Sequence, residues 1–93
     1  MGRMPLLTDE VITQRLAALP GWARDGRSIH RTFTFKGFPE AVAFVETLVA
    51  PAEALNHHPD VDIRYNRVIV TLSTHDSGGL TDHDLTLAAR ISH

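Results

Sequence analysis

The chain has 93 residues, of which 43% are hydrophobic and 22% charged, and its net charge is −2 with the histidines neutral. This length accommodates one domain, predicted to span residues 1–93. The lack of a basic excess argues against nucleic acid as a direct partner, and the lack of cysteine excludes disulfides and thiolate metal sites. The apolar stretch at residues 4–7 is too short for a signal peptide or a membrane span, so we expect a cytoplasmic protein without a membrane partner.

The first third of the sequence predicts a helix followed by a hairpin. Thr8 can cap a helix that ends at Pro20-Gly21, because these two residues stop helices. Its apolar side chains recur at helical spacing: Val11, Ile12, Leu16 and Leu19. A short strand then begins at Trp22, and Asp25-Gly26 forms a turn. The second strand alternates apolar side chains at Ile29, Phe33 and Phe35.

The middle of the sequence predicts a long helix from about Pro39 to Asn56. Its apolar stripe is broad for so small a domain. The stripe comprises Ala41, Val42, Val45, Leu48, Val49, Ala52 and Leu55. Pro51 lies inside this helix, where it removes one backbone donor and crowds the carbonyl four residues earlier. We therefore expect a kink at this point.

The last third predicts two strands and a helix. The first strand carries Val61, Ile63 and Tyr65, a tight turn follows at Asn66-Arg67, and the second strand turns Val68, Val70 and Leu72 inward. After a loop at residues 77–79, Thr81 is expected to cap a final helix, with Asp84 as the acid of a capping box. The order α-β-β-α-β-β-α predicts an α+β fold, in which a four-stranded antiparallel sheet has three helices packed on one face.

Two adjacent histidines, in the segment EALNHHPD at residues 53–60, are the most informative polar residues. Glu53 and His57 are four residues apart and share a helix face, so the carboxylate can orient the ring. Pro59 forces His58 into extended geometry, so the two rings leave the chain in different directions. From the residues alone, three interpretations stay open: a polar helix end, an acid/base site, or a metal site that lacks the usual chelating spacing.

The other candidate residues have ordinary structural explanations as well. His75 ends the predicted strand VIVTLSTH, where a polar strand terminus would suffice. Asp84 is explained by capping alone, and Trp22 is typical of a core or rim aromatic. The remaining histidines, for which the sequence offers no partner, are interpreted as surface residues: His30, His83 and His93.

Taken together, these residues resemble the signature of the pterin-4a-carbinolamine dehydratase family. The matching pattern is Glu53-x3-His57-His58-Pro59, followed by Tyr65, His75 and Asp84. The stretches LNHHPD and TLSTHDSGGLTDHDLTLA are similar to the most characteristic parts of that family, and the likeness extends from Gly21-Trp22 to the last predicted helix. The resemblance implies the same α+β fold and a hydro-lyase activity, that of a 4a-hydroxytetrahydrobiopterin dehydratase, which removes water from a 4a-hydroxytetrahydropterin.

The resemblance also implies the site residues. They are three catalytic histidines, His57, His58 and His75, with Glu53 and Asp84 as supporting acids and Trp22 as a wall of the pterin site. We expect His58 and His75 to transfer the protons, and His57, oriented by Glu53, to bind or polarise the substrate. Histidine suits this chemistry because its unperturbed pKa of about 6.5 lets one ring be charged and another neutral near pH 7. No metal or redox cofactor is required.

The implied partners are a small-molecule pterin and further copies of the same chain. The resemblance implies a homodimer whose sheet continues between subunits, and a homotetramer made by helix packing, against which the kink at Pro51 counts. Exposed sheet edges and a small core also favour association. The alternatives are a transcription-factor dimerisation module on the same fold, a protein that binds a related pterin, and a metal-dependent hydrolase.

Overall fold

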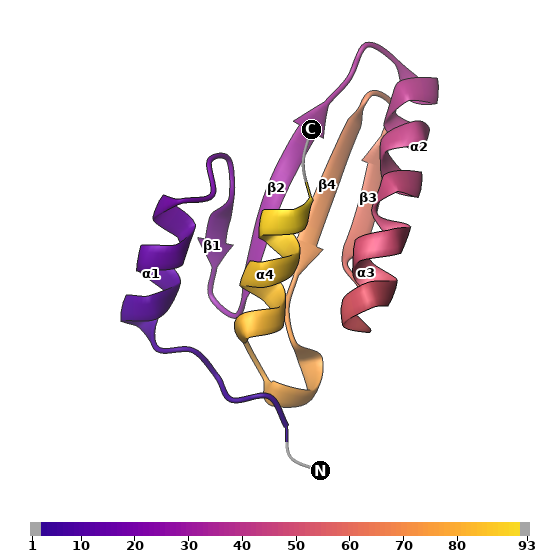
Figure 1. Ribbon diagram of the computed structural model, residues 1–93. Coiled ribbons are helices and arrows are strands. Elements are labelled where there is room, and N and C mark those ends of the chain that lie inside the picture. Colours follow the sequence, from indigo (N-terminus) through magenta and orange to yellow (C-terminus); the bar gives the residue numbers. More distant parts are fainter. Residues whose placement is uncertain (1–2, 92–93) are drawn as a thin grey trace.

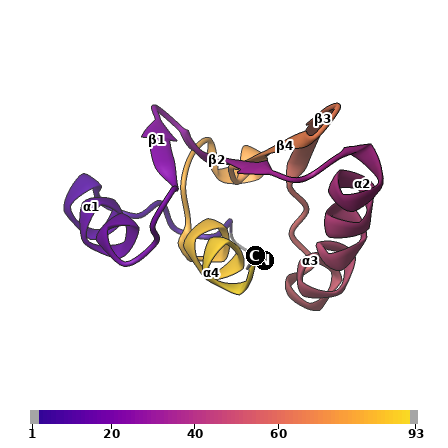
Figure 2. The same cartoon turned by 90° about the horizontal axis from the view of Figure 1, so that it is seen from above.

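The computed structural model of the chain describes residues 3–91. It contains a four-stranded antiparallel sheet with the strand order β1-β2-β4-β3, and its helices lie on one face of that sheet (Figure 1 and Figure 2). The elements in chain order are α1 (Asp9–Ala17), β1 (Ala23–Asp25), β2 (Ser28–Thr34), α2 (Phe38–Thr47), α3 (Val49–Leu55), β3 (Asp60–Arg64), β4 (Arg67–Leu72), a 3₁₀ turn (His75–Ser77) and α4 (Asp82–Arg90). The predicted architecture is confirmed, with α2 and α3 as the two halves of the expected long helix.

The core lies between the sheet and the helices, because alternate side chains of the central strands point toward them. Ile29 of β2 faces Leu72 of β4, Phe33 faces Val68, and all four side chains are buried. The helices contribute further buried side chains, among them Ile12, Ala41, Phe44, Leu85 and Leu87. The opposite face of the sheet carries no helix in the part of the chain that the structure describes (Figure 2).

The long helix is interrupted at Leu48, three residues before Pro51. The proline has no N–H to donate to the carbonyl of Thr47, so the regular i to i−4 ladder cannot continue across this turn. A tighter i to i−3 hydrogen bond forms there instead, in which the N–H of Leu48 donates to the Val45 carbonyl at 3.0 Å. The Thr47 hydroxyl also donates to the Phe44 carbonyl at 2.6 Å. The expected kink therefore takes the form of two helices, α2 and α3.

Two expected strand ends are placed differently in the structure. Arg64 pairs with Arg67, so the turn between β3 and β4 consists of Tyr65 and Asn66, one residue earlier than predicted. Tyr65 has φ 54° and is 70% exposed, so it belongs to the turn and not to the inner face of a strand. β4 ends at Leu72, and His75 begins the 3₁₀ turn, because the backbone N–H of Thr74 pairs with the carbonyl of Gly79 and folds the chain back.

An ion pair joins α1 to the beginning of α4. Arg15 Nη1 donates to Asp82 Oδ1 at 2.5 Å. The hydrogen-bonded Arg15 guanidinium holds the pKa of the Asp82 carboxyl below its usual value. This contact helps to place the first turn of α4, where the polar side chains described next are located.

Candidate active site

A buried polar cluster is centred on Asp84, in the first turn of α4. The Asp84 side chain folds back, and its Oδ2 accepts hydrogen bonds from the backbone N–H of Thr81 at 2.9 Å and from the hydroxyl of Thr74 at 2.7 Å. The Thr81 hydroxyl lies 2.7 Å from Thr74 Oγ1 and donates to it, because Thr74 uses its own hydrogen toward Asp84. Asp84 and Thr81 are both buried, and the capping box predicted from the sequence is present.

The same carboxylate binds His57. Helix α3 ends where Asn56 adopts the left-handed conformation, φ 48° and ψ 45°, which asparagine tolerates better than most residues. The N–H of His57 then bonds the carbonyl of Ala52 at 3.0 Å. The ring lies against α4, with Nε2 2.5 Å from Asp84 Oδ1, and the side chain is only 12% exposed. Because a carboxylate only accepts hydrogen bonds, Nε2 carries the hydrogen, and Nδ1 of the neutral ring is left as an acceptor.

Glu53 pairs with His58, so the predicted pairing of Glu53 with His57 is wrong. Glu53 Oε2 lies 2.5 Å from His58 Nε2. The i, i+4 argument assumed that the helix continues to His57, whereas the left-handed Asn56 ends it one residue earlier. The side chains of His58 and Glu53 are 58% and 66% exposed, so their pair stabilises the fold by less than about 1 kcal/mol.

His57 lines a polar cavity of about 440 Å³, a volume within the range of small-molecule sites. The cavity lies between the end of α3, the start of α4 and the 3₁₀ turn. Its lining comprises Arg3, Met4, Asn56, His57, Thr74, Asp76, Ser77 and His83. The ring of His83 packs against that of His57, with centroids 5.5 Å apart and planes inclined by 51°. The interpretation of His83 as a surface residue missed this contact, for which the sequence carries no local signal.

The other predicted site residues do not line this cavity. His75 is exposed, and it stands between Thr74 and Asp76, which do line the cavity. His58 and Glu53 instead border a separate groove of about 290 Å³ between α3 and β3, whose other walls are mostly apolar. The two adjacent histidines therefore open onto different cavities.

Trp22 lies in the hydrophobic core. Its side chain is 7% exposed and packs edge-on against Phe33, with ring centroids 6.3 Å apart. Among the two remaining histidines interpreted as surface residues, His30 is half-buried on β2. His93 lies outside the described residues.

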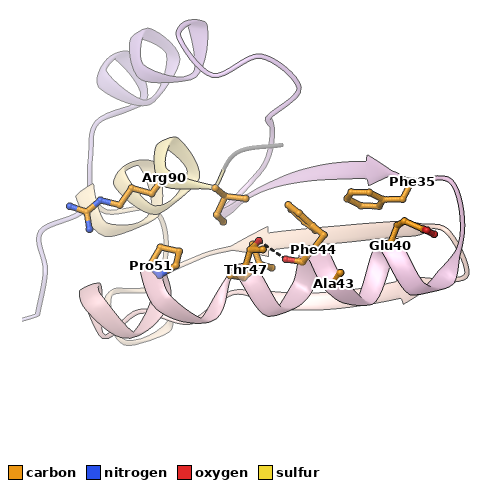
Figure 3. A pocket seen from close by; sticks show the side chains of 9 residues that line it. Phe35, Glu40, Ala43, Phe44, Thr47, Pro51 and Arg90 are labelled. Carbon is orange, nitrogen blue, oxygen red and sulfur yellow. Dashed lines mark hydrogen bonds between the residues drawn. The ribbon is translucent and has the colours of Figure 1, made fainter.

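A further groove, of about 670 Å³, runs along α2 and α3 beside the end of α4 (Figure 3). Its walls are mostly apolar, and Phe44 lies between the two ends of the groove (Figure 3). Charged side chains mark its two ends, Glu40 at one and Arg90 at the other (Figure 3). This groove contains none of the histidines.

Residues 3–91 contain neither a metal-binding cluster nor a membrane-spanning helix. In this range no three His, Asp or Glu side chains are grouped so that they could hold a metal ion. Likewise, no helix within the described residues is long and apolar enough to cross a membrane.

The fold and the cavity together define a class of small α+β proteins in which a histidine paired with a buried aspartate faces a site of small-molecule size. The family model described as pterin 4 alpha carbinolamine dehydratase matches residues 5–93. The chain therefore belongs to the pterin-4a-carbinolamine dehydratase family, as the resemblance suggested.

Individual relatives agree with this membership. A protein of Roseiflexus castenholzii, provisionally named pterin-4-alpha-carbinolamine dehydratase, is 52% identical over 86 residues, which are 92% of each chain. One of Mycobacteroides abscessus, named in the same way, is 49% identical over 88 residues, 95% of this chain and 94% of its own.

Two solved structures are similar in fold. The crystal structure of a transcriptional coactivator/pterin dehydratase from Brucella melitensis is 38% identical and superposes with a TM-score of 0.88, covering 94% of this chain and 95% of its own. A pterin dehydratase-like protein, identified as a RuBisCO assembly factor in the alpha-carboxysome, is 22% identical with a TM-score of 0.59, over 75% of this chain and 81% of its own. This second likeness concerns the fold alone.

Proposed function

We propose that the protein is a 4a-hydroxytetrahydropterin dehydratase, a hydro-lyase that works by histidine acid/base catalysis. Family membership supports the reaction. The observation that carries the proposed mechanism is the hydrogen bond between His57 Nε2 and the buried Asp84 carboxylate. A carboxylate that fixes one nitrogen of a histidine leaves the other nitrogen oriented for proton transfer, the arrangement of a general base with its orienting acid.

The reaction requires two proton transfers at neighbouring atoms of the substrate. Carbon C4a carries the hydroxyl that departs, and the adjacent N5 carries a hydrogen. Removal of the N5 proton leaves an electron pair that forms the C4a–N5 double bond, and the hydroxyl takes up a proton and leaves as water. The products are water and the quinonoid dihydropterin, and no oxidant or reductant is consumed.

We assign these transfers to His57 and His75. His57 lines the cavity, and Nδ1 of its neutral ring is an acceptor that suits the removal of the N5 proton. His75 stands between two residues that line the cavity and can approach from the opposite segment of the chain. His58, Glu53 and Trp22 act outside this step, because His58 and Glu53 border another groove and Trp22 is packed in the core.

The direct test is the rate at which a freshly generated 4a-hydroxytetrahydropterin loses water with and without the protein. We expect catalysis above the spontaneous rate, with the same rate after treatment with EDTA. Activity abolished by EDTA and restored by zinc would contradict a metal-independent mechanism. A protein that is inactive but purifies with a stoichiometric protein partner would support the dimerisation module instead.

The working form is proposed to be at least a homodimer, in which a second copy covers the groove along α2 and α3. A two-fold axis across the groove would bring Glu40 of each copy to Arg90 of the other, because the two charges mark opposite ends (Figure 3).

Light scattering at micromolar concentration should give a mass of at least twice 10.3 kDa. Glu40→Arg or Arg90→Glu alone should lower that mass, and the double exchange should restore it. A wild-type mass near one chain would refute the dimer.

A further inference from the structure

We propose that His83 is a positioning residue of the active site, which holds the ring of His57 in the orientation that the Asp84 hydrogen bond requires. The inference rests on the proposed function of the cavity, and it adds a residue that the signature pattern of the family resemblance does not contain. It comes from the contact between the rings of His57 and His83, and from the fact that His83 and Asp84, neighbours on α4, both contact His57.

The hydrogen bond to Asp84 restrains only one atom of the His57 ring. His57 follows the left-handed Asn56, so its backbone lies outside helix α3 and is not held by a helical ladder on both sides. A ring held covalently at Cβ and by a hydrogen bond at Nε2 can still rotate about the line through these two points. A second contact, on another side of the ring, is needed to place Nδ1 at a defined point in the cavity.

His83 supplies a contact of this kind. It precedes Asp84 in the first turn of α4, and neighbouring residues of a helix point about 100° apart, so the two side chains approach His57 from different directions. The ring centroids of His57 and His83 are 5.5 Å apart, within the range of direct aromatic contact. This spacing also leaves no room for a flat substrate between the two rings, which excludes a stacking role on that side.

The helix that carries both residues is well anchored. Asp84 closes the capping box at its first turn, and Arg15 of α1 holds Asp82. His83 is itself half-buried at the cavity wall. Asp84 and His83 are therefore fixed relative to each other by the first turn of α4, and both contacts to the His57 ring come from this one helix.

The test compares two substitutions at this position. His83→Ala removes the contact and should lower kcat by about 10- to 100-fold with KM changed less than about threefold, because misplacement of a catalytic group affects the reaction step. His83→Phe keeps a flat ring without nitrogens and should recover most of the loss. His30→Ala, on the sheet face without helices, is the matched histidine control and should leave kcat unchanged.

A measurement without substrate separates this inference from the proposed function. Long-range proton–nitrogen NMR spectra of the wild type near pH 8 should show His57 in the single tautomer with hydrogen on Nε2. His83→Ala should broaden or mix these signals, and His83→Phe should restore them. If the wild type lacks dehydratase activity, the proposed function fails, while the spectra still decide the role of His83.

Three outcomes would overturn the inference. One is an unchanged His57 spectrum in the His83→Ala variant. Another is an equal loss of kcat in both variants, which would mean that a nitrogen of His83 acts on the substrate directly. The third is a His83→Ala variant with wild-type kcat. Circular dichroism of each variant checks that α4 remains folded.

Discussion

His57→Ala should lower kcat by about 10²- to 10⁴-fold, the usual contribution of a positioned general acid or base. The reason is that His57, among the histidines of residues 3–91, is the one that both pairs with a buried carboxylate and lines the polar cavity. The effect on KM should be small by comparison. The measurement is steady-state dehydration of a 4a-hydroxytetrahydropterin, corrected for the spontaneous rate.

The matched control is His58→Ala, the neighbouring histidine. Its ring is 58% exposed, pairs with Glu53 and borders a different groove, so we expect a loss in kcat of less than about tenfold. This reverses the roles expected from the residues alone, where His58 transferred a proton and His57 bound the substrate. If His58→Ala costs as much as His57→Ala or more, the assignment from the hydrogen bonds is refuted.

Asp84→Asn should lower kcat by about 10³- to 10⁴-fold, as expected when a histidine is forced into the wrong tautomer. Oδ2 must still accept from the Thr81 N–H and the Thr74 hydroxyl, so the amide oxygen takes that position and the NH₂ group faces His57. His57 then has to accept at Nε2 and carry its hydrogen on Nδ1. The loss of charge-assisted bonds should also reduce the free energy of unfolding by about 1–3 kcal/mol.

The control for this substitution is Asp82→Asn, two residues earlier on the same helix. Asp82 binds Arg15 and not His57, and its side chain is 58% exposed, so the variant should keep its kcat and lose at most about 1 kcal/mol in urea unfolding. The pKa of Asp82 is lowered in the folded state. Its contribution to the free energy of unfolding is therefore fully present above the unfolded pKa near 4, and it is lost as the pH falls through the lower folded pKa. An Asp84→Asn variant with kcat within tenfold of the wild type would contradict the proposed role of the carboxylate.

The sequence was sufficient for features that depend on residues close together in the chain. The alternation of apolar side chains set the inner faces of β2 and β4, and the three-residue spacing of Thr81 and Asp84 predicted their capping box. Pro51 predicted the interruption of the long helix, because the loss of a backbone donor is a property of the residue itself. Even these local arguments placed the β3–β4 turn one residue too late. Tyr65 has a positive φ there, and the turn contains no glycine that would have indicated it.

The site depended on the tertiary structure, because its contacts join distant segments. Asp84 looked fully explained by capping, yet its second oxygen binds His57, 27 residues earlier in the chain. The single left-handed residue Asn56 moved Glu53 from His57 to His58, and no spacing rule anticipates where a helix ends within one residue. Local sequence thus determined which residues could do acid/base chemistry. The packing of the end of α3 against α4 decided which histidines line the same cavity, and these are His57 and His83.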